Sequence, residues 1–283
     1  MSLADPAETH APKGQPLPAQ PPLQRVLGSV PVSVAIYLTV MGLIVYGAFT
    51  GAQDMGYNWQ WHRVPQFLWS FTDDGFQLGE IFYGLGTTIR LSVTSFAFAT
   101  LLGLVVALLR LSGLVVGSAV AVAFLEFIRN IPLLVLLYLF YYVLGPIFGL
   151  DRYTASVLTL AVFHAALISE ILRAGINAVA TGQWEAAKSI GMTTAQTYRY
   201  IILPQSVRFM LPPMTGEMVH LIKSSAIVSV IAVAELTTIG RNIISDTFMS
   251  FEIWFTVAAV YMVLTLALSV GVTFLEKKYA VDQ

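Results

Sequence analysis

Long charge-free apolar runs are the feature that most restricts the fold of this chain. Uncharged runs of seventeen to twenty-three residues occupy residues 31–50, 91–109, 131–150, 153–169 and 253–275. A helix needs about 20 apolar residues to cross a bilayer core, and an open sheet edge cannot be satisfied in lipid. A sixth apolar run, 209–234, is interrupted by Glu217, His220 and Lys223. The sequence therefore predicts an all-α integral membrane protein with six transmembrane helices.

The composition excludes several other classes of protein. Hydrophobic residues make up 57% of the 283 residues and charged residues only 11%, whereas soluble domains carry about 25% charged residues. A net charge of −1 gives no indication of a nucleic-acid partner. Without cysteine there is no disulfide framework and no thiolate ligand. The four histidines (His10, His62, His164 and His220) are scattered, so no metal site is expected, and His164 is interpreted as a satisfied core histidine.

The distribution of lysine and arginine predicts the orientation in the membrane. With the amino terminus in the cytoplasm, ten basic residues fall inside and four outside, and Lys223 is left out as intramembrane. The inside group is Lys13, Arg25, Arg110, Arg129, Arg173, Lys188, Arg199, Arg208, Lys277 and Lys278. The outside group is Arg63, Arg90, Arg152 and Arg241. Both termini are therefore expected in the cytoplasm.

Four regions are expected along the chain. Residues 1–29 form a polar tail with six prolines, which predicts disorder on the cytoplasmic side. Residues 30–50 form an extra N-terminal transmembrane helix, too long to be a signal peptide. Residues 51–83 form an external, tryptophan-rich loop in which we expect an interfacial helix, with contact to an external partner as the alternative. Residues 84–283 form the main transmembrane domain, in which 114–125 is too short to span.

A charged interval, residues 181–204, separates two of the apolar runs and has local helix signals. Glu185 is expected in the first turn of a short helix, where a negative charge suits the helix dipole. Gly191 is expected to end that helix in the left-handed conformation. Thr193 and Gln196 have the spacing of a capping box for a second short helix. Pro204 is expected to end or kink the second helix.

Seven positions of this interval carry a resemblance to a known family. They are Glu185, Ala186, Ala187, Gly191, Ile201, Leu203 and Pro204. The pattern reads E-A-A, then any three residues, G, any nine residues and I-x-L-P. It resembles the coupling loop of permease subunits of binding-protein-dependent ABC importers. The alternative is an ordinary helix-turn-helix loop.

Three further stretches are similar to the polar amino acid branch of that family. They are EFIRNIPLLV (126–135), EILRAGI (170–176) and LIKSSAIVS (221–229). The resemblance covers roughly seven tenths of the chain, from about residue 84 onward, and implies a five-helix core to which 30–50 is an addition. It implies import of polar L-amino acids, with glutamate, glutamine, aspartate or asparagine, or a broad range, as the leading substrates.

The resemblance also implies partners. These are an ABC ATPase dimer, a second permease subunit (a related chain rather than a second copy), a periplasmic amino-acid-binding protein and the bacterial inner membrane. In the coupling loop, Glu185 would pair with a basic residue of the ATPase, Ala186 and Ala187 would keep the contact flat, and Gly191 and Pro204 would set its shape. The chain has no G-x-x-x-x-G-K-[ST] sequence. ATP and magnesium are therefore expected on the partner ATPase, with no cofactor and no catalytic residue in this chain.

Charges inside the membrane are costly and commonly functional. Lys223, next to Ser224, is the leading candidate to receive a substrate carboxylate, and Glu217, His220 and Glu170 join it as tentative pathway residues. The alternatives for Lys223 are pairing with Glu217 or Glu170, or snorkelling to an interface.

Two acid–base pairs spaced three residues apart are interpreted as structural. They are Glu170 with Arg173, and Glu126 with Arg129.

Two other classes of protein are the alternatives. A self-contained secondary transporter or channel predicts inverted repeats and broken helices; only one interrupted helix stands out, and the coupling-loop pattern would have no explanation. A membrane-bound enzyme predicts clustered ligands or a nucleophile motif, and neither is visible in the sequence.

Overall fold

The computed structural model describes residues 30–72 and 75–279. The expected disordered tail, 1–29, lies outside the described residues. The chain divides into two compact units at Asn58 and Trp59. The described part of the first unit is mainly one helix, α2 (Val30–Asp54), which is long and apolar enough to cross a membrane. It contains the expected extra span and extends four residues beyond residue 50.

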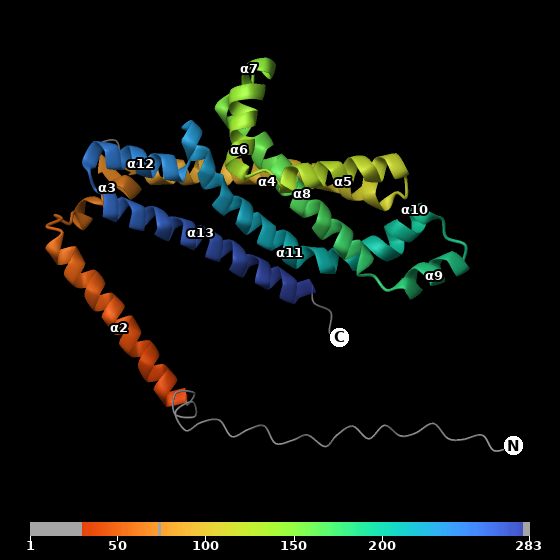
Figure 1. Ribbon diagram of the computed structural model, residues 1–283, viewed down its shortest axis with the longest axis horizontal. Helices are drawn as coiled ribbons and strands as arrows, with labels where there is room; N and C mark the ends of the chain where they lie inside the picture. Colours follow the sequence, from red (N-terminus) through yellow and green to blue (C-terminus); the bar gives the residue numbers. More distant parts are fainter. Residues whose placement is uncertain (1–29, 73–74, 280–283) are drawn as a thin grey trace. The chain divides into compact units, whose positions relative to one another are not determined.

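The second unit is a helical bundle (Figure 1). Its long helices are α4 (Glu80–Leu111), α8 (Arg152–Asn177), α11 (Leu203–Ser224) and α13 (Ser250–Tyr279). Helix α4 packs along α8, α8 packs on α11, and α11 packs on α13. By length and composition, the described residues hold four spans, or up to six when each bent helix pair is counted as one. The all-α membrane class is therefore confirmed, and a count of six spans is compatible with it.

Two pairs of consecutive helices in this unit are bent at a short break. The first bent pair joins α5 (Val115–Arg129) to the helical stretch Leu133–Phe148 at an angle of 104°. That stretch consists of α6 (Leu133–Tyr138), the π-helical segment η2 (Leu139–Leu144) and α7 (Gly145–Phe148). The chain breaks at Asn130–Pro132 because proline disfavours helical backbone in the residue before it. The separation of 114–125 from the following span is confirmed.

The second bent pair lies near the carboxyl end. Helix α11 continues as the 3-10 segment η4 (Ser225–Ile231), and α12 (Leu236–Thr247) follows at a 47° bend. Ala232 has a positive φ of 57° at the break. Glu235 then caps α12 by accepting hydrogen bonds from the backbone N–H groups of Thr237 and Thr238 at 2.8 and 2.7 Å. The sequence reasoning missed α12 because its apolar residues are too few for a separate span.

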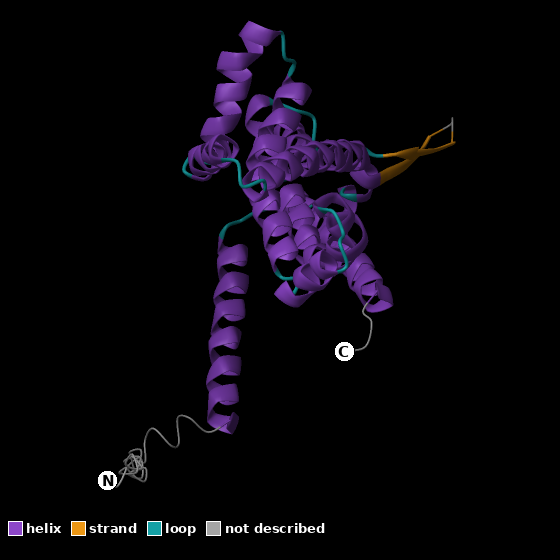
Figure 2. Cartoon of the chain, turned by 90° about the vertical axis from the view of Figure 1, so that its right-hand side faces the viewer, coloured by secondary structure: helices purple, strands orange, loops and turns teal. Residues whose placement is uncertain are grey.

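The segment before α4, where an interfacial helix is expected, has little helix. It holds the 3-10 turn η1 (Trp61–Arg63), the one-turn helix α3 (Pro65–Leu68) and an antiparallel hairpin that was not expected. The hairpin pairs β1 (Trp69–Thr72) with β2 (Gly75–Leu78) and projects from the helices of this unit (Figure 2). Helix α4 then begins at Glu80 and contains the whole uncharged run 91–109.

Close packing of α4 on α8 forms the centre of the bundle. Small residues allow the backbones to approach closely, as is common between membrane helices. A Cβ atom on Gly103 would lie 2.9 Å from the Cγ2 atom of Ile168 and 3.0 Å from the carbonyl oxygen of Ala165. Ala99, Ala161 and Ile168 form a buried cluster at this contact.

Candidate functional site

The segment that carries the seven-position pattern lies beyond the ends of α8 and α11 (Figure 1). It consists of α9 (Thr181–Ser189), α10 (Thr194–Thr197) and the π-helical segment η3 (Tyr198–Ile202), which leads into α11. We call residues 181–204 the coupling loop. The side chains of Ile176, Ile202 and Met210 form its buried base, with Leu111 packed against them. The loop is therefore seated where α4 and α8 end and α11 begins.

Gly191 ends α9 as expected. It has a φ of +75°, which glycine adopts without the steric cost of a side chain. Its N–H donates to the carbonyl of Lys188 at 3.0 Å, and the N–H of Met192 donates to the carbonyl of Ala187 at 3.1 Å. These two bonds form a Schellman motif, which satisfies carbonyl groups at the helix end.

The expected capping box is confirmed. The Gln196 backbone N–H donates to the Thr193 hydroxyl at 3.3 Å. The Thr193 backbone N–H in turn donates to the Gln196 side-chain oxygen at 2.9 Å. Because both bonds are local, the turn between α9 and α10 is fixed by its own residues.

Pro204 does not end the helix. Helical backbone continues without a break from Thr194 through Pro204 to Ile231. Pro204 has no N–H to donate, and its ring clashes with the carbonyl of the residue four before it in an α-helix. The π-helical turn η3 directly before α11 shifts the hydrogen bonds of this region and accommodates the ring.

The coupling loop presents two different faces. Glu185, Ala186 and Gly191 are exposed, whereas Ala187 is 3% exposed and packs inward. The two alanines therefore do not form one flat contact surface, which corrects the expectation for Ala187. Glu185 is the fifth residue of α9. It lies beyond the first turn, so the helix-dipole argument does not apply to it.

One exposed apolar residue of the coupling loop was missed by the sequence reasoning. Ile190, directly before Gly191, is 76% exposed. The signal that would have found it is its place at the C-cap of α9, where the chain turns away from the bundle.

Aromatic and amide contacts hold α9 against η3 and α11. The rings of Trp184 and Tyr198 meet edge to face with centroids 5.1 Å apart. The Gln205 amide donates to the Gln183 side-chain oxygen at 3.3 Å. Of the remaining pattern residues, Ile201 is half-buried, and Leu203 and Pro204 are exposed.

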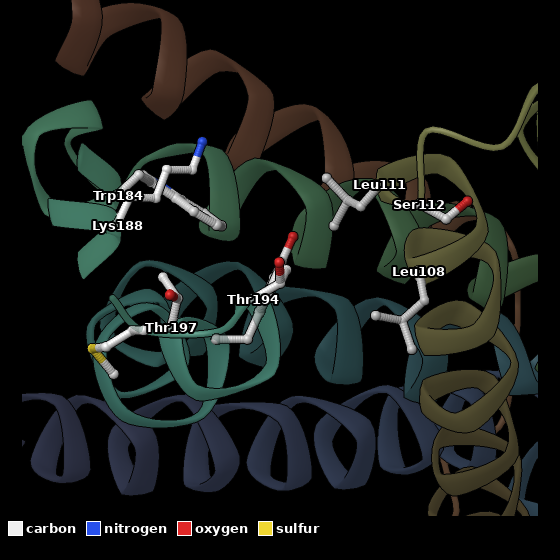
Figure 3. Close-up of a pocket in the computed structure, with 9 residues that line it drawn as sticks. Leu108, Leu111, Ser112, Trp184, Lys188, Thr194 and Thr197 are labelled. Carbon is white, nitrogen blue, oxygen red and sulfur yellow. The ribbon is translucent and has the colours of Figure 1, made fainter. Parts of the chain in front are cut away.

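A cavity of about 530 Å³ separates part of the coupling loop from the end of α4. In Figure 3, Trp184 and Lys188 of α9 lie above Thr194 and Thr197, across from Leu108 of α4. The loop is thus packed at its base and open beside α4.

Three polar side chains meet between α8 and α11. His164 of α8 is fully buried, and its Nδ1 lies 2.5 Å from the Glu217 Oε1 atom of α11. The other carboxylate oxygen, Oε2, lies 3.5 Å from Nδ1 of His220. The two imidazole rings are 5.2 Å apart between centroids. We call His164, Glu217 and His220 the polar triad. The sequence reasoning placed Glu217 and His220 together but interpreted His164 as a satisfied core residue.

Lys223 lies one turn beyond the polar triad, near the end of α11. It is exposed in this chain, and Ser224 beside it is half-buried. No salt bridge joins Lys223 to Glu217 or Glu170 among the residues the structure describes. Pairing with either acid, which the sequence allows, is therefore not observed.

Glu170 joins two helices by ion pairs. The expected pair with Arg173 is confirmed at 2.8 Å from Nη2 to Oε2. The other carboxylate oxygen of Glu170 pairs with Arg110 near the end of α4. Arg110 was assigned only to the basic inside group, because residues 60 positions apart give no local signal of contact.

The expected pair of Glu126 with Arg129 is not formed. Within the described residues no salt bridge joins these side chains, and the Asn130 amide lies 3.4 Å from the Glu126 carboxylate instead. The Asn130 amide also donates to the Glu126 backbone carbonyl at 2.7 Å. Asn130 caps the end of α5 and is nearer to the carboxylate than the longer arginine side chain.

A multi-pass helical bundle with an exposed helix-turn-helix seated at one end fits the class of membrane transport permeases. Comparison with known proteins assigns it more closely. The family of binding-protein-dependent transport system inner membrane components matches residues 99–281. The chain belongs to this family, the permease subunits of ABC importers.

Two relatives and one solved structure cover most of the bundle. The probable glutamine ABC transporter permease protein GlnM of Bacillus subtilis (strain 168) is 39% identical over 69% of this chain and 91% of its own length. The glutamine transport system permease protein GlnP of Escherichia coli (strain K12) is 35% identical over 75% of this chain and 98% of its own length. The crystal structure of an amino acid ABC transporter with histidines aligns with a TM-score of 0.66 at 40% identity, covering 70% of this chain and 94% of that one.

Proposed function

We propose that this chain is the membrane permease subunit of an ATP-driven importer of polar L-amino acids of the glutamate, glutamine, aspartate and asparagine type. The observation that carries the proposal is the coupling loop. Its seven pattern residues stand at the family spacing, and its Glu185, Ala186 and Ile190 are exposed at the end of the bundle. The names of the relatives support amino acids, glutamine among them, as the substrate class.

The coupling loop would transmit the movement of an ABC ATPase dimer to the bundle. Glu185 would pair with a basic residue of the ATPase, and Ile190 would add apolar contact beside it. Because the loop packs on the buried side chains of Ile176 and Ile202, a movement of the loop would also move α8 and α11. ATP and magnesium would bind to the ATPase, and this chain would bind no nucleotide and perform no hydrolysis.

The remaining partners follow from the same proposal. A periplasmic amino-acid-binding protein would deliver the substrate, and a second, related permease chain would complete the pathway in the bacterial inner membrane. Both termini and the coupling loop would face the cytoplasm, as the distribution of basic residues predicts. Co-purification of a tagged copy with an untagged copy would reveal a homodimer and refute the heterodimer.

Lys223 is the residue proposed to receive the substrate carboxylate. Its exposure at the end of α11 and its lack of a salt bridge in the described part of the chain leave the ammonium group accessible. Ser224, Glu217, His220 and Glu170 are proposed to line the same pathway.

Uptake measurements in proteoliposomes test the proposal. The complete transporter, with its binding protein, should import labelled glutamine when ATP is enclosed on the ATPase side, and competition with each of the twenty amino acids should define the substrate range. Uptake that requires an ion gradient and no ATP would instead establish a secondary transporter. Uptake unaffected by any polar amino acid would refute the substrate class.

A further inference from the structure

The polar triad brings three metal-binding groups together inside the bundle. One ring nitrogen of each histidine and one carboxylate oxygen of Glu217 all lie within 4.8 Å of one another. His164 is fixed on α8 by complete burial, whereas His220 on α11 is exposed. The triad therefore combines two buried groups, His164 and Glu217, with one exposed group, His220, whose side chain can adjust.

The negative charge of the Glu217 carboxylate is not paired with a lysine or arginine among the described residues. Within the described residues, no lysine or arginine nitrogen lies within 4.0 Å of its carboxylate, and its two close partners are histidines. A carboxylate within a membrane-spanning segment is costly unless a positive charge compensates it. Imidazole is neutral unless it is protonated, so a bound cation would supply the compensating positive charge.

His164 faces Glu217 with only one of its two ring nitrogens. Its Nε2 is fully buried and has no hydrogen-bond partner, although buried polar groups are normally hydrogen-bonded. His164 is therefore not a satisfied core histidine. Its polar contact is made by Nδ1, toward Glu217.

The chemistry of the three groups selects the ligand. Two imidazole nitrogens and one carboxylate oxygen form a set that binds zinc and related divalent transition metals at about 2.0–2.2 Å, with one position left for water. Tetrahedral geometry at such bond lengths places ligand atoms about 3.3 Å apart. Nδ1 of His164 and Oε1 of Glu217 are now at 2.5 Å, and an ion between them would separate them while His220 approaches by a side-chain rotation.

We propose that His164, Glu217 and His220 bind a divalent transition-metal ion, represented here by zinc, between α8 and α11. Such an ion would supply the positive charge that Glu217 lacks and would link two helices of the bundle. The site goes beyond the proposed transport function, and metal binding can be measured whether or not amino acids are imported.

The test measures zinc on the purified complete transporter, isolated with an affinity tag that contains no histidine. The unaltered complex is expected to retain zinc after gel filtration, measured by plasma mass spectrometry, and the metal should raise its thermal denaturation temperature. Glu217→Gln and His220→Ala should each lower the zinc affinity at least about tenfold. His62→Ala is the matched control, because His62 is an exposed histidine outside the triad, and it should bind zinc as the unaltered complex does.

X-ray absorption should show two imidazole nitrogens and oxygen around the zinc in the unaltered complex. The proposal is overturned if the unaltered complex and the Glu217→Gln complex retain the same amount of zinc. Should His164→Ala fail to assemble, His220→Ala decides the matter, because His220 is exposed and its truncation leaves no buried cavity. Unchanged zinc affinity in His220→Ala would equally refute the three-ligand site.

Discussion

Gly191 ends α9 with a φ of +75°, and nothing lies within 4 Å of the position that a Cβ atom would take there. The substitution Gly191→Ala therefore acts through backbone strain and not through a steric clash with a neighbour. An L-residue in the left-handed region costs about 1–2 kcal/mol. A change of that size shifts a conformational equilibrium by a factor of roughly 5 to 30.

The strain falls on the two hydrogen bonds that close α9, from Gly191 to Lys188 and from Met192 to Ala187. If these hydrogen bonds are weakened, the end of α9 is no longer held in one orientation. The packing of the buried base of the loop is unchanged. We expect Gly191→Ala to insert and to assemble with the ATPase, and to show reduced ATP hydrolysis in response to the loaded binding protein. Proteoliposomes containing the complete transporter provide the assay.

Two matched variants separate strain from a general effect of substitution. Gly182→Ala changes an exposed glycine of the same helix that also has no atom within 4 Å and has no positive φ, so it should couple normally. Gly191→Asn should couple better than Gly191→Ala, because asparagine tolerates the left-handed region more readily. Equal coupling in Gly191→Ala and Gly182→Ala would refute the reasoning.

Three further predictions address the pathway, a helix cap and the helix packing. Lys223→Met should raise the apparent Km for amino-acid uptake roughly tenfold or more, by loss of a charged hydrogen bond, while Lys223→Arg retains most of the affinity; an unchanged Km in Lys223→Met would contradict the proposed role. A hydrogen bond from the Thr154 hydroxyl lowers the pKa of Asp151, the N-cap of α8, below its ordinary value of 3.8. Asp151→Ala should therefore cost about 1 kcal/mol, measured as thermal stability, at pH values above 3.8, and the difference should vanish as the pH falls through the lower folded-state pKa; a difference that persists in acid would refute this. Gly103→Val should cost about 1–3 kcal/mol and lower the denaturation temperature, because a Cβ atom there would meet α8 at 2.9 Å, whereas Gly86→Ala, with open space around it, should have little effect.

The local geometry of the coupling loop could be predicted from the sequence in most of its details. The capping box of Thr193 with Gln196 and the left-handed Gly191 depend on bonds between residues three to five positions apart. The burial of Ala187 could not be predicted, because it depends on which side of α9 meets the bundle.

The hairpin shows a sequence signal that was available and overlooked. The run Asp73-Asp74-Gly75 holds residue types that favour turns, between two short stretches of alternating character. The tryptophan-rich composition of this region favoured a membrane-interface interpretation instead. Composition indicates where a segment resides, whereas the turn residues indicate its backbone shape.

The sequence by itself determined that this chain crosses a membrane as helices and where its coupling loop lies. Those properties depend on the length of apolar runs and on short-range patterns, and both are written into consecutive residues. Only the tertiary structure decided that His164 meets Glu217 and that Arg110 meets Glu170, across 53 and 60 positions. Such contacts depend on which helices pack together and at what rotation, because the side chain at one position has no local signal of a partner on another helix.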